Sequence, residues 1–137
     1  MPDVDSGDTT RQGPDRSPWW LDNLADDATL EGAAMNGTAH GADAVREIVL
    51  KARELCEFQD VSLACDFGDN GFLEVHTASV RGEPLKVVLT VTCNAEGEAQ
   101  ELAVLHRPRN SLLLFSRLMR EEFAGTPLAE HFLSDES

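Results

Sequence analysis

The chain has 137 residues, which is enough for one domain with its own hydrophobic core. Its 25 acidic residues outnumber 11 basic ones, and the net charge of -14 disfavours binding to nucleic-acid phosphates or anionic membrane surfaces. The apolar runs are far too short to span a bilayer, so neither nucleic acid nor a membrane is an expected partner.

The cysteines and histidines form no pattern that indicates a metal or a cofactor. Cys56, Cys65 and Cys93 are odd in number, widely spaced and contain no CxxC pair, and the 4 histidines are scattered. The glycines belong to turn sequences and form no phosphate-binding loop. Together with the lack of a recognisable signal peptide, the odd cysteine count predicts a reducing, cytoplasmic compartment, with no cofactor and no metal.

The N-terminal region changes character at Pro18. Residues 2–17 are rich in Asp, Gly, Ser, Thr and Pro, so we predict a disordered acidic tail over residues 1–17. Ser17 can cap a helix and Pro18 suits its first turn, which predicts a short helix over residues 18–26.

A strand and an amphipathic helix are predicted next. The strand covers residues 28–34, and turn-forming residues over 36–41 predict a loop after it. From Ala42 to about Phe58 the apolar residues recur at the spacing of one helical face. These residues are Val45, Ile48, Ala52 and Leu55.

Short β-rich segments separated by tight turns follow this helix and predict an antiparallel meander. The strands cover residues 61–67, 72–80, 85–93 and 98–106. Asn110 or Ser111 can cap a last helix that runs to about Ala124, where Gly125 and Pro127 end it. The domain is therefore expected over residues 18–124, with a C-terminal tail over residues 125–137.

This order of elements predicts an α+β fold. A curved antiparallel or mixed sheet would wrap around the helices that precede the meander, and a C-terminal helix would follow it. A cone-shaped sheet of this kind keeps one end open, which is a natural pocket for a small molecule.

Several local strings also point to a known superfamily. They are Leu24-Ala25-Asp26-Asp27-Ala28-Thr29-Leu30-Glu31, Gly41-Ala42-Asp43-Ala44-Val45-Arg46-Glu47-Ile48, Asn94-Ala95-Glu96-Gly97 and Arg107-Pro108. With these strings in this order, the chain resembles the nuclear transport factor 2-like (SnoaL-like) superfamily over about residues 18–124. The resemblance implies a cystatin-like roll. It implies no single function, because members include isomerases, cyclases, hydrolases, dehydratases and proteins without chemistry.

The resemblance also allows a comparison with ketosteroid isomerase-like members. These place a carboxylate base on the first strand and use a tyrosine and a protonated carboxylic acid as oxyanion donors. The positions that match the base and the acid are Gly32 and Leu89, and the chain has no tyrosine. We therefore expect no ketosteroid isomerisation by those groups.

Alternation along the strands assigns a mostly apolar set of side chains to the pocket, together with residues of the first strand and one tryptophan. The expected pocket residues are Trp20, Leu30, Gly32, Leu85, Val87, Leu89, Val91, Leu102 and Val104.

The second meander strand has two possible orientations. The resemblance places Glu74 and His76 inside, where they would converge with His106 as catalytic acid and base groups. Alternation alone allows the opposite, because Leu73 and Val75 are the more apolar pair and would then fill the core. His106 could equally lie at the rim, because it ends its strand.

Two functions follow from these alternatives. In the first, the chain binds a small apolar molecule and acts on it as an isomerase, cyclase or hydratase. In the second, it is a non-catalytic binding or assembly module. In both we expect a homodimer through the outer face of the sheet, which carries apolar residues and few charges. These residues are Leu73, Val75, Val88 and Leu105.

Overall fold

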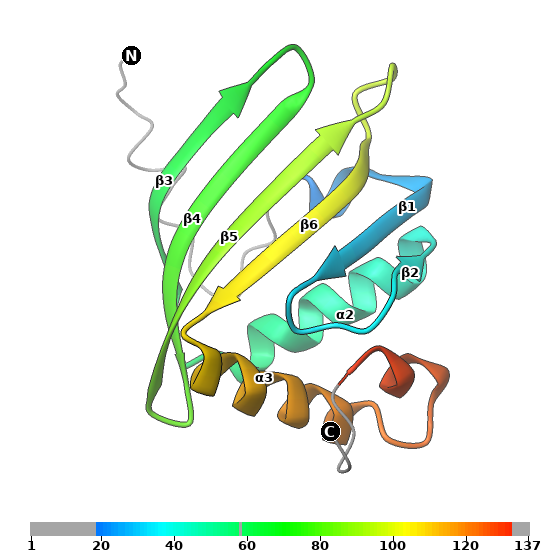
Figure 1. The fold of residues 1–137 in the computed structure, drawn as a ribbon. Helices are drawn as coiled ribbons and strands as arrows, with labels where there is room; N and C mark the ends of the chain where they lie inside the picture. Colours follow the sequence, from blue (N-terminus) through cyan, green and yellow to red (C-terminus); the bar gives the residue numbers. More distant parts are fainter. Residues whose placement is uncertain (1–18, 58, 133–137) are drawn as a thin grey trace.

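The computed structural model describes residues 19–57 and 59–132, and Figure 1 shows their arrangement. The tail predicted over residues 1–17 lies outside the described residues. In chain order the elements are the 3-10 helix η1 (Leu21–Asn23), β1 (Leu24–Gly32), β2 (Ala39–His40), α2 (Ala42–Leu55), β3 (Gln59–Phe67), β4 (Gly71–Val80), β5 (Glu83–Cys93), β6 (Ala99–Arg107), α3 (Arg109–Glu122) and the 3-10 helix η2 (Pro127–His131).

Within the described residues the strands form one curved sheet, in the order β2-β1-β6-β5-β4-β3. β1 runs parallel to β6, and all other neighbouring strands are antiparallel. The predicted meander is thus present from β3 to β6, and β1 extends it through a parallel pairing. The predicted α+β fold, with a curved mixed sheet and a C-terminal helix, is confirmed.

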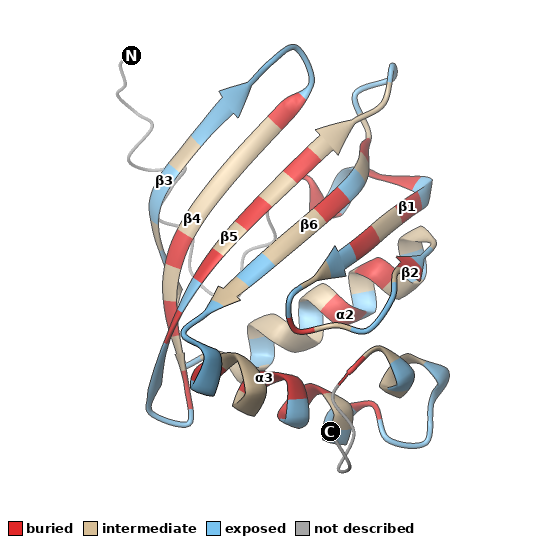
Figure 2. Ribbon diagram, in the orientation of Figure 1, coloured by how far each residue is buried: buried red, intermediate tan, exposed pale blue. Residues whose placement is uncertain are grey.

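Both long helices pack on the concave side of this sheet. α2 packs against β1 through a face that buries Val45 and Ile48, and α3 contacts β4, β5 and β6. Buried residues alternate with more exposed ones along β4 and β5, as Figure 2 shows. This alternation arises because successive side chains point to opposite faces of a strand, and only the concave face meets the helices.

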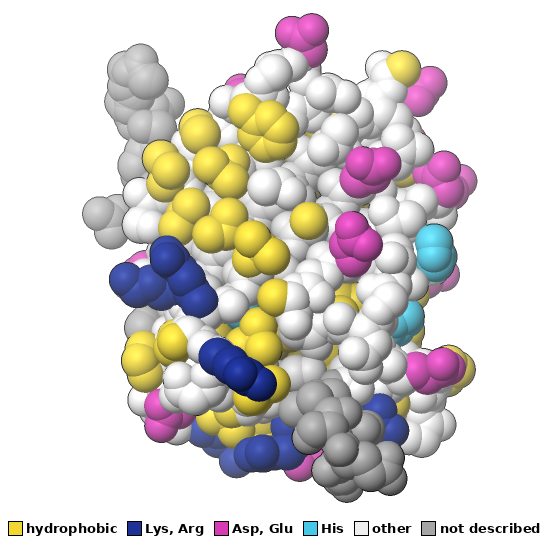
Figure 3. All heavy atoms as spheres, in the orientation of Figure 1, with side chains coloured by type: hydrophobic (Ala, Val, Ile, Leu, Met, Phe, Trp, Pro, Cys, Tyr) yellow, Lys and Arg dark blue, Asp and Glu magenta, His cyan; other side chains and the backbone are white. Residues whose placement is uncertain are grey.

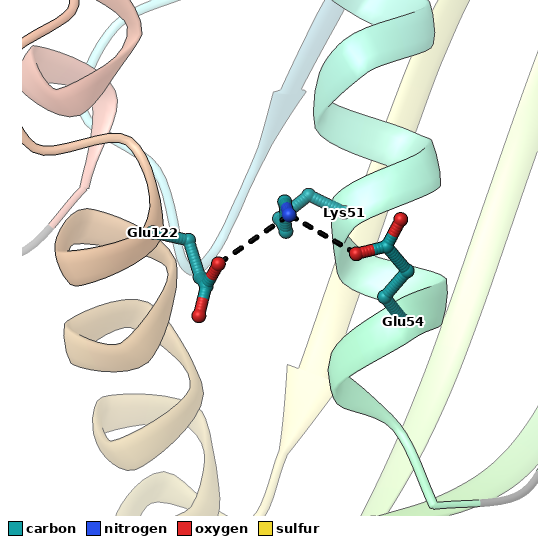
Figure 4. Close-up of polar contacts among 3 residues, drawn as sticks. All are labelled: Lys51, Glu54 and Glu122. Carbon is teal, nitrogen blue, oxygen red and sulfur yellow. Dashed lines mark hydrogen bonds and ion pairs between the residues drawn. The ribbon is translucent and has the colours of Figure 1, made fainter.

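A bridging lysine also connects the two helices. The Lys51 ammonium nitrogen on α2 lies 3.0 Å from Glu54 Oε1 on the same helix and 3.3 Å from Glu122 Oε1 on α3 (Figure 4). Hydrogen bonds to Glu54 and then to Glu122 raise the pKa of Lys51 above its ordinary value. None of the helices in the described ranges is long and apolar enough to cross a membrane.

The helix predicted over residues 18–26 is wrong. Its described part holds only the single 3-10 turn of η1, and β1 begins directly at Leu24. Leu24 and Ala25 are both buried, and Leu24 pairs with Ala99 of β6. Pairing and burial in the sheet therefore outweigh the local signal for a helix.

Two other segments contain structure that their sequences did not predict. The expected loop over residues 36–41 includes β2, whose two residues pair with Thr29 and Leu30 of β1. After α3, where a tail was expected from residue 125, the chain forms η2 and then buries Phe132. Phe132 joins the main core, so the folded unit continues past the end of α3.

Candidate functional site

A cavity of about 100 Å³ lies between the concave face of the sheet and the two helices. Most of its wall is apolar and comes from the sheet, from α2, from α3 and from residues near both ends of the described chain. Polar side chains gather on one part of the wall. The lining residues are Trp20, Leu30, Ala34, Met35, Ile48, Val49, Ala52, Arg53, Cys56, Gln59, Val61, Glu74, His76, Val87, Leu89, Val104, His106, Phe115, Met119 and Phe132.

The register of the sheet brings the two histidines of the wall into one row. His76 on β4 pairs with Val87 on β5, and Val87 pairs in turn with His106 on β6. All three therefore face the concave side of a sheet whose curvature directs them toward the cavity. Of the two orientations of the second meander strand, the structure has the one with Glu74 and His76 inside.

Burial keeps both imidazoles neutral at ordinary pH. Burial, together with a smaller contribution from the positive charge of Arg53, lowers the pKa of His76 to about 4. Burial also lowers the pKa of His106 to about 4, with an added contribution from charge on His76. A neutral imidazole has one nitrogen that donates a hydrogen bond and one that accepts.

The Nδ1 atoms of both rings are buried and have no hydrogen-bond partner among the described residues. The His106 ring packs on Phe115, with the ring centroids 4.6 Å apart and the planes tilted by 31°. The indole Nε1 of Trp20, which also lines the cavity, is likewise buried without a partner in the described chain. Because nearly all buried polar atoms in proteins are paired, these nitrogens are candidates for a hydrogen bond to a water molecule or to a polar group of a ligand.

Glu74 supplies a carboxyl group on the same wall. It lies two positions before His76 on the same face of β4 and pairs with Leu89 of β5. Burial raises the pKa of Glu74, and the nearby charge of Arg53 partly opposes that shift. Arg53 is held at the end of α2 by a hydrogen bond from its Nη1 to Gln59 Oε1, at 3.3 Å.

The structure brings together many of the residues expected in the pocket. Glu74, His76 and His106 line the cavity, as do five of the expected apolar residues: Trp20, Leu30, Val87, Leu89 and Val104. Leu85, Val91 and Leu102 are buried in the core but do not line the cavity.

Gly32 is the remaining expected pocket residue, and it leaves no room for a side chain. A Cβ atom there would lie 2.3 Å from the carbonyl oxygen of Val104 and 2.7 Å from its Cγ1. The position that the resemblance gives to the carboxylate base is therefore closed by β6, and any acid–base group must come from elsewhere in this chain.

The sequence did not indicate the contributions of the helices and of the C-terminal segment. Arg53 and Cys56 come from the end of α2, Phe115 and Met119 from α3, and Phe132 follows η2. The amphipathic period of α3 could have suggested Phe115 and Met119, which lie four residues apart on one helical face. Among the described residues, no three His, Cys, Asp or Glu side chains form a group that could hold a metal ion.

No protein-family model matches the sequence, and no curated protein matches it. Solved structures, in contrast, match the fold. An uncharacterised protein conserved in bacteria, with a cystatin-like fold, from Silicibacter pomeroyi has a TM-score of 0.72 at 17% identity, over 77% of this chain and 74% of that one. A steroid delta-isomerase from Pseudomonas aeruginosa has a TM-score of 0.71 at 19% identity, over 76% and 77%.

A third structure is a nuclear transport factor 2-like protein of unknown function from Burkholderia xenovorans. It has a TM-score of 0.53 at 16% identity and covers 63% of this chain and 66% of that one. The fold is that of the nuclear transport factor 2-like proteins. At these identities the match extends to the backbone and not to the chemistry. This chain has no tyrosine and no room for an acid at Gly32, so it lacks the ketosteroid isomerase groups that the resemblance implies.

Proposed function

We propose that the cavity binds one small, mostly apolar molecule with a carbonyl oxygen, and that the chain moves a proton on that molecule. The reaction would be of the isomerase, cyclase or hydratase kind. The observation that carries this proposal is the pair of buried imidazoles, His76 and His106, whose Nδ1 atoms have no partner in the described chain. A polar ligand atom that reached either ring nitrogen would satisfy a group that otherwise carries a desolvation cost.

The pKa shifts divide the acid–base roles. With a pKa of about 4, His76 and His106 are weak bases but suitable neutral donors to an oxygen that gains negative charge. Glu74 has a raised pKa, so its carboxylate is a stronger base than an ordinary one. In this arrangement Glu74 takes the proton from the carbon next to the carbonyl, and the imidazoles stabilise the enolate oxygen.

Deuterium exchange tests this proposal without knowledge of the natural substrate. Heptan-2-one is incubated with the protein in D2O, binding is followed by native mass spectrometry, and deuterium entry next to the carbonyl by NMR. We expect one ketone per subunit and exchange faster than in buffer. Glu74→Gln should bind the ketone and lose about 100-fold or more of the added exchange rate.

Variants of the histidines separate binding from a general loss of structure. His76→Phe and His106→Phe should each weaken ketone binding by about tenfold, which corresponds to roughly 1.4 kcal/mol. His40→Gln is the matched control, because His40 is exposed on β2 and outside the cavity. Wild-type protein that takes up no ketone at millimolar concentration would refute the proposal.

A second candidate function, a non-catalytic binding or assembly module, is favoured by one feature outside the cavity. Leu63, Phe67 and Leu105 are about half exposed, with 48%, 45% and 57% of their surfaces accessible. An exposed apolar face of this kind is typical of a protein interface.

Cys56, Cys65 and Cys93 are all unpaired, which supports our proposal of a reducing, cytoplasmic location.

A further inference from the structure

After α3 the described part of the chain returns to the cavity and lines it with an aromatic side chain. We call residues 126–132 the C-terminal strap. It consists of Thr126, the short helix η2 and Phe132, whose ring is 1% exposed and lines the cavity. The ring stacks on Phe123 at the end of α3, with the centroids 6.1 Å apart and the planes 15° apart.

The strap is attached to the domain by hydrogen bonds with Arg120 and Asn36 and by apolar packing. Arg120 donates from Nη1 to the carbonyl oxygens of Ala129, at 3.0 Å, and Phe132, at 3.2 Å. Asn36 donates from Nδ2 to the Phe132 carbonyl at 3.3 Å and from its backbone N–H to the His131 carbonyl at 2.6 Å. No residue of η2 is buried. Phe132 is the most deeply buried apolar residue of the strap, and Leu128 and Ala129 are partly buried against the same core.

Trp20, near the other end of the described chain, is also buried and lies close to a paired strand. It precedes η1 and β1, and β1 is hydrogen-bonded on both sides, to β2 and to β6. The strap has no such strand pairing. Segments with few buried apolar contacts open at lower free energy than paired strands. Of these two cavity walls, we expect the strap, which has no strand pairing, to open at the lower free energy.

The size of the cavity gives the strap a functional consequence. Its volume is about 100 Å³, whereas pockets for drug-sized ligands have roughly 300–1,000 Å³. With Phe132 in place, only a compact molecule fits. If the ring moves out, the space that it fills joins the cavity, because the ring is part of the cavity wall.

We propose that Phe132 sets the size of the ligand that the pocket accepts, by filling the part of the cavity that a longer molecule would need. This inference rests on the proposed function, because it concerns the same pocket. Short ligands bind beside the ring. Longer ones must displace it and the strap with it, which lowers their affinity in the wild-type protein.

The test is a series of straight-chain ketones from pentan-2-one to undecan-2-one, with affinities measured by native mass spectrometry and calorimetry. In the wild type, affinity should rise with each methylene by about fourfold and then stop rising at a short chain. In Phe132→Ala the rise should continue for several more carbons. Phe132→Leu keeps an apolar anchor for the fold, and its limit should lie between those of the wild type and Phe132→Ala.

Phe123→Leu is the matched control. Phe123 belongs to the same buried cluster and stacks on Phe132, but it does not line the cavity. This variant should weaken the fold without moving the chain-length limit. Hydrogen exchange at the strap amides, such as that of Phe132, which bonds to Ala129 O, should increase when undecan-2-one binds the wild type.

The outcomes separate this inference from the proposed function. If the wild type binds short ketones and neither Phe132 variant moves the limit, the strap does not set ligand size and this inference is wrong. If the wild type and all variants bind no ketone, the proposed function itself fails and the inference fails with it. If only the Phe132 variants bind ketones, the wild type has no bound ligand whose length the ring could limit, so the proposed function and this inference are both overturned.

Discussion

His76 and His106 make the stability of the domain depend on pH. Their pKa values of about 4 in the folded state compare with 6.5 for an ordinary histidine. Between these two values the unfolded chain binds protons that the folded chain does not. The free energy of unfolding must therefore fall as the pH falls from about 6.5 to 4.

We predict a loss of roughly 2 to 3 kcal/mol for each of the two histidines over this range, from about 1.4 kcal/mol per pKa unit. Glu74 acts in the opposite direction, because its raised pKa favours the folded state at lower pH. Urea unfolding at several pH values, on the wild type and on the double variant His76→Phe and His106→Phe, would measure this. The wild type should lose more unfolding free energy than the double variant as the pH falls from about 6.5 to 4. The same pH dependence in both proteins would contradict this prediction.

At the scale of elements, local periodicity was enough for α2 and for the meander. The predicted α2 was three residues too long, because Cys56 turns to an extended conformation with φ of -77° and ψ of 135°. The strand orientation of β4 could not be predicted from its own residues. Leu73 and Val75 lie on the outer face, where they are only half buried. Because both are apolar, their alternation in the sequence is the one expected for a strand face that packs in the core.

The residues that sequence could not predict are those placed by contacts between distant segments. Phe132 has no periodic neighbours and follows Gly125 and Pro127, so nothing local indicates that it is buried. The same holds for the first residues of β1, which are strand only because β6 lies beside them. Glu74, His76 and His106 could be chosen as candidate acid–base groups from their residue types alone. Whether they face the same cavity could not be predicted, because this depends on the register of β4, β5 and β6.

The contact between α2 and α3 leads to a second prediction, for Lys51. Lys51→Met removes the charge and keeps an apolar stem, so it should lower the melting temperature slightly at low salt through loss of the ion pairs to Glu54 and Glu122. Arg117→Met is the matched control, because Arg117 is exposed on α3 and its loss changes the net charge equally. High salt should abolish the difference, and a difference that persists in 1 M salt would contradict this account.

At the scale of the whole molecule, the convex face of the sheet is a candidate interface. Figure 3 shows hydrophobic side chains gathered on one part of this face, with basic side chains below them and acidic side chains to their right. One row crosses four strands through the pairings Leu63–Val75, Val75–Val88 and Val88–Leu105. On the same face, the pair next to Val88–Leu105 is Lys86–Arg107. Glu101 lies on β6 on the other side of the apolar row.

This distribution fits a second copy of the chain, because a two-fold axis at the apolar row can bring the basic end of one copy toward the acidic end of the other. We therefore predict a homodimer, measurable by light scattering at micromolar concentration. Leu105→Glu should shift the mass to that of a monomer, whereas Leu50→Glu, which changes an exposed leucine on α2, should not. A monomeric wild type would reject the prediction.

The parallel pairing of β1 with β6 also determines when the domain can be completed during synthesis. β1 ends at Gly32, but its partner strand begins only at Ala99, so most of the chain must leave the ribosome before the two can meet. The hairpins from β3 to β6 join neighbours in sequence and can form earlier. We expect a nascent chain that stops within β5 to expose the apolar residues of β1 and α2, and thus to depend on chaperones until β6 emerges.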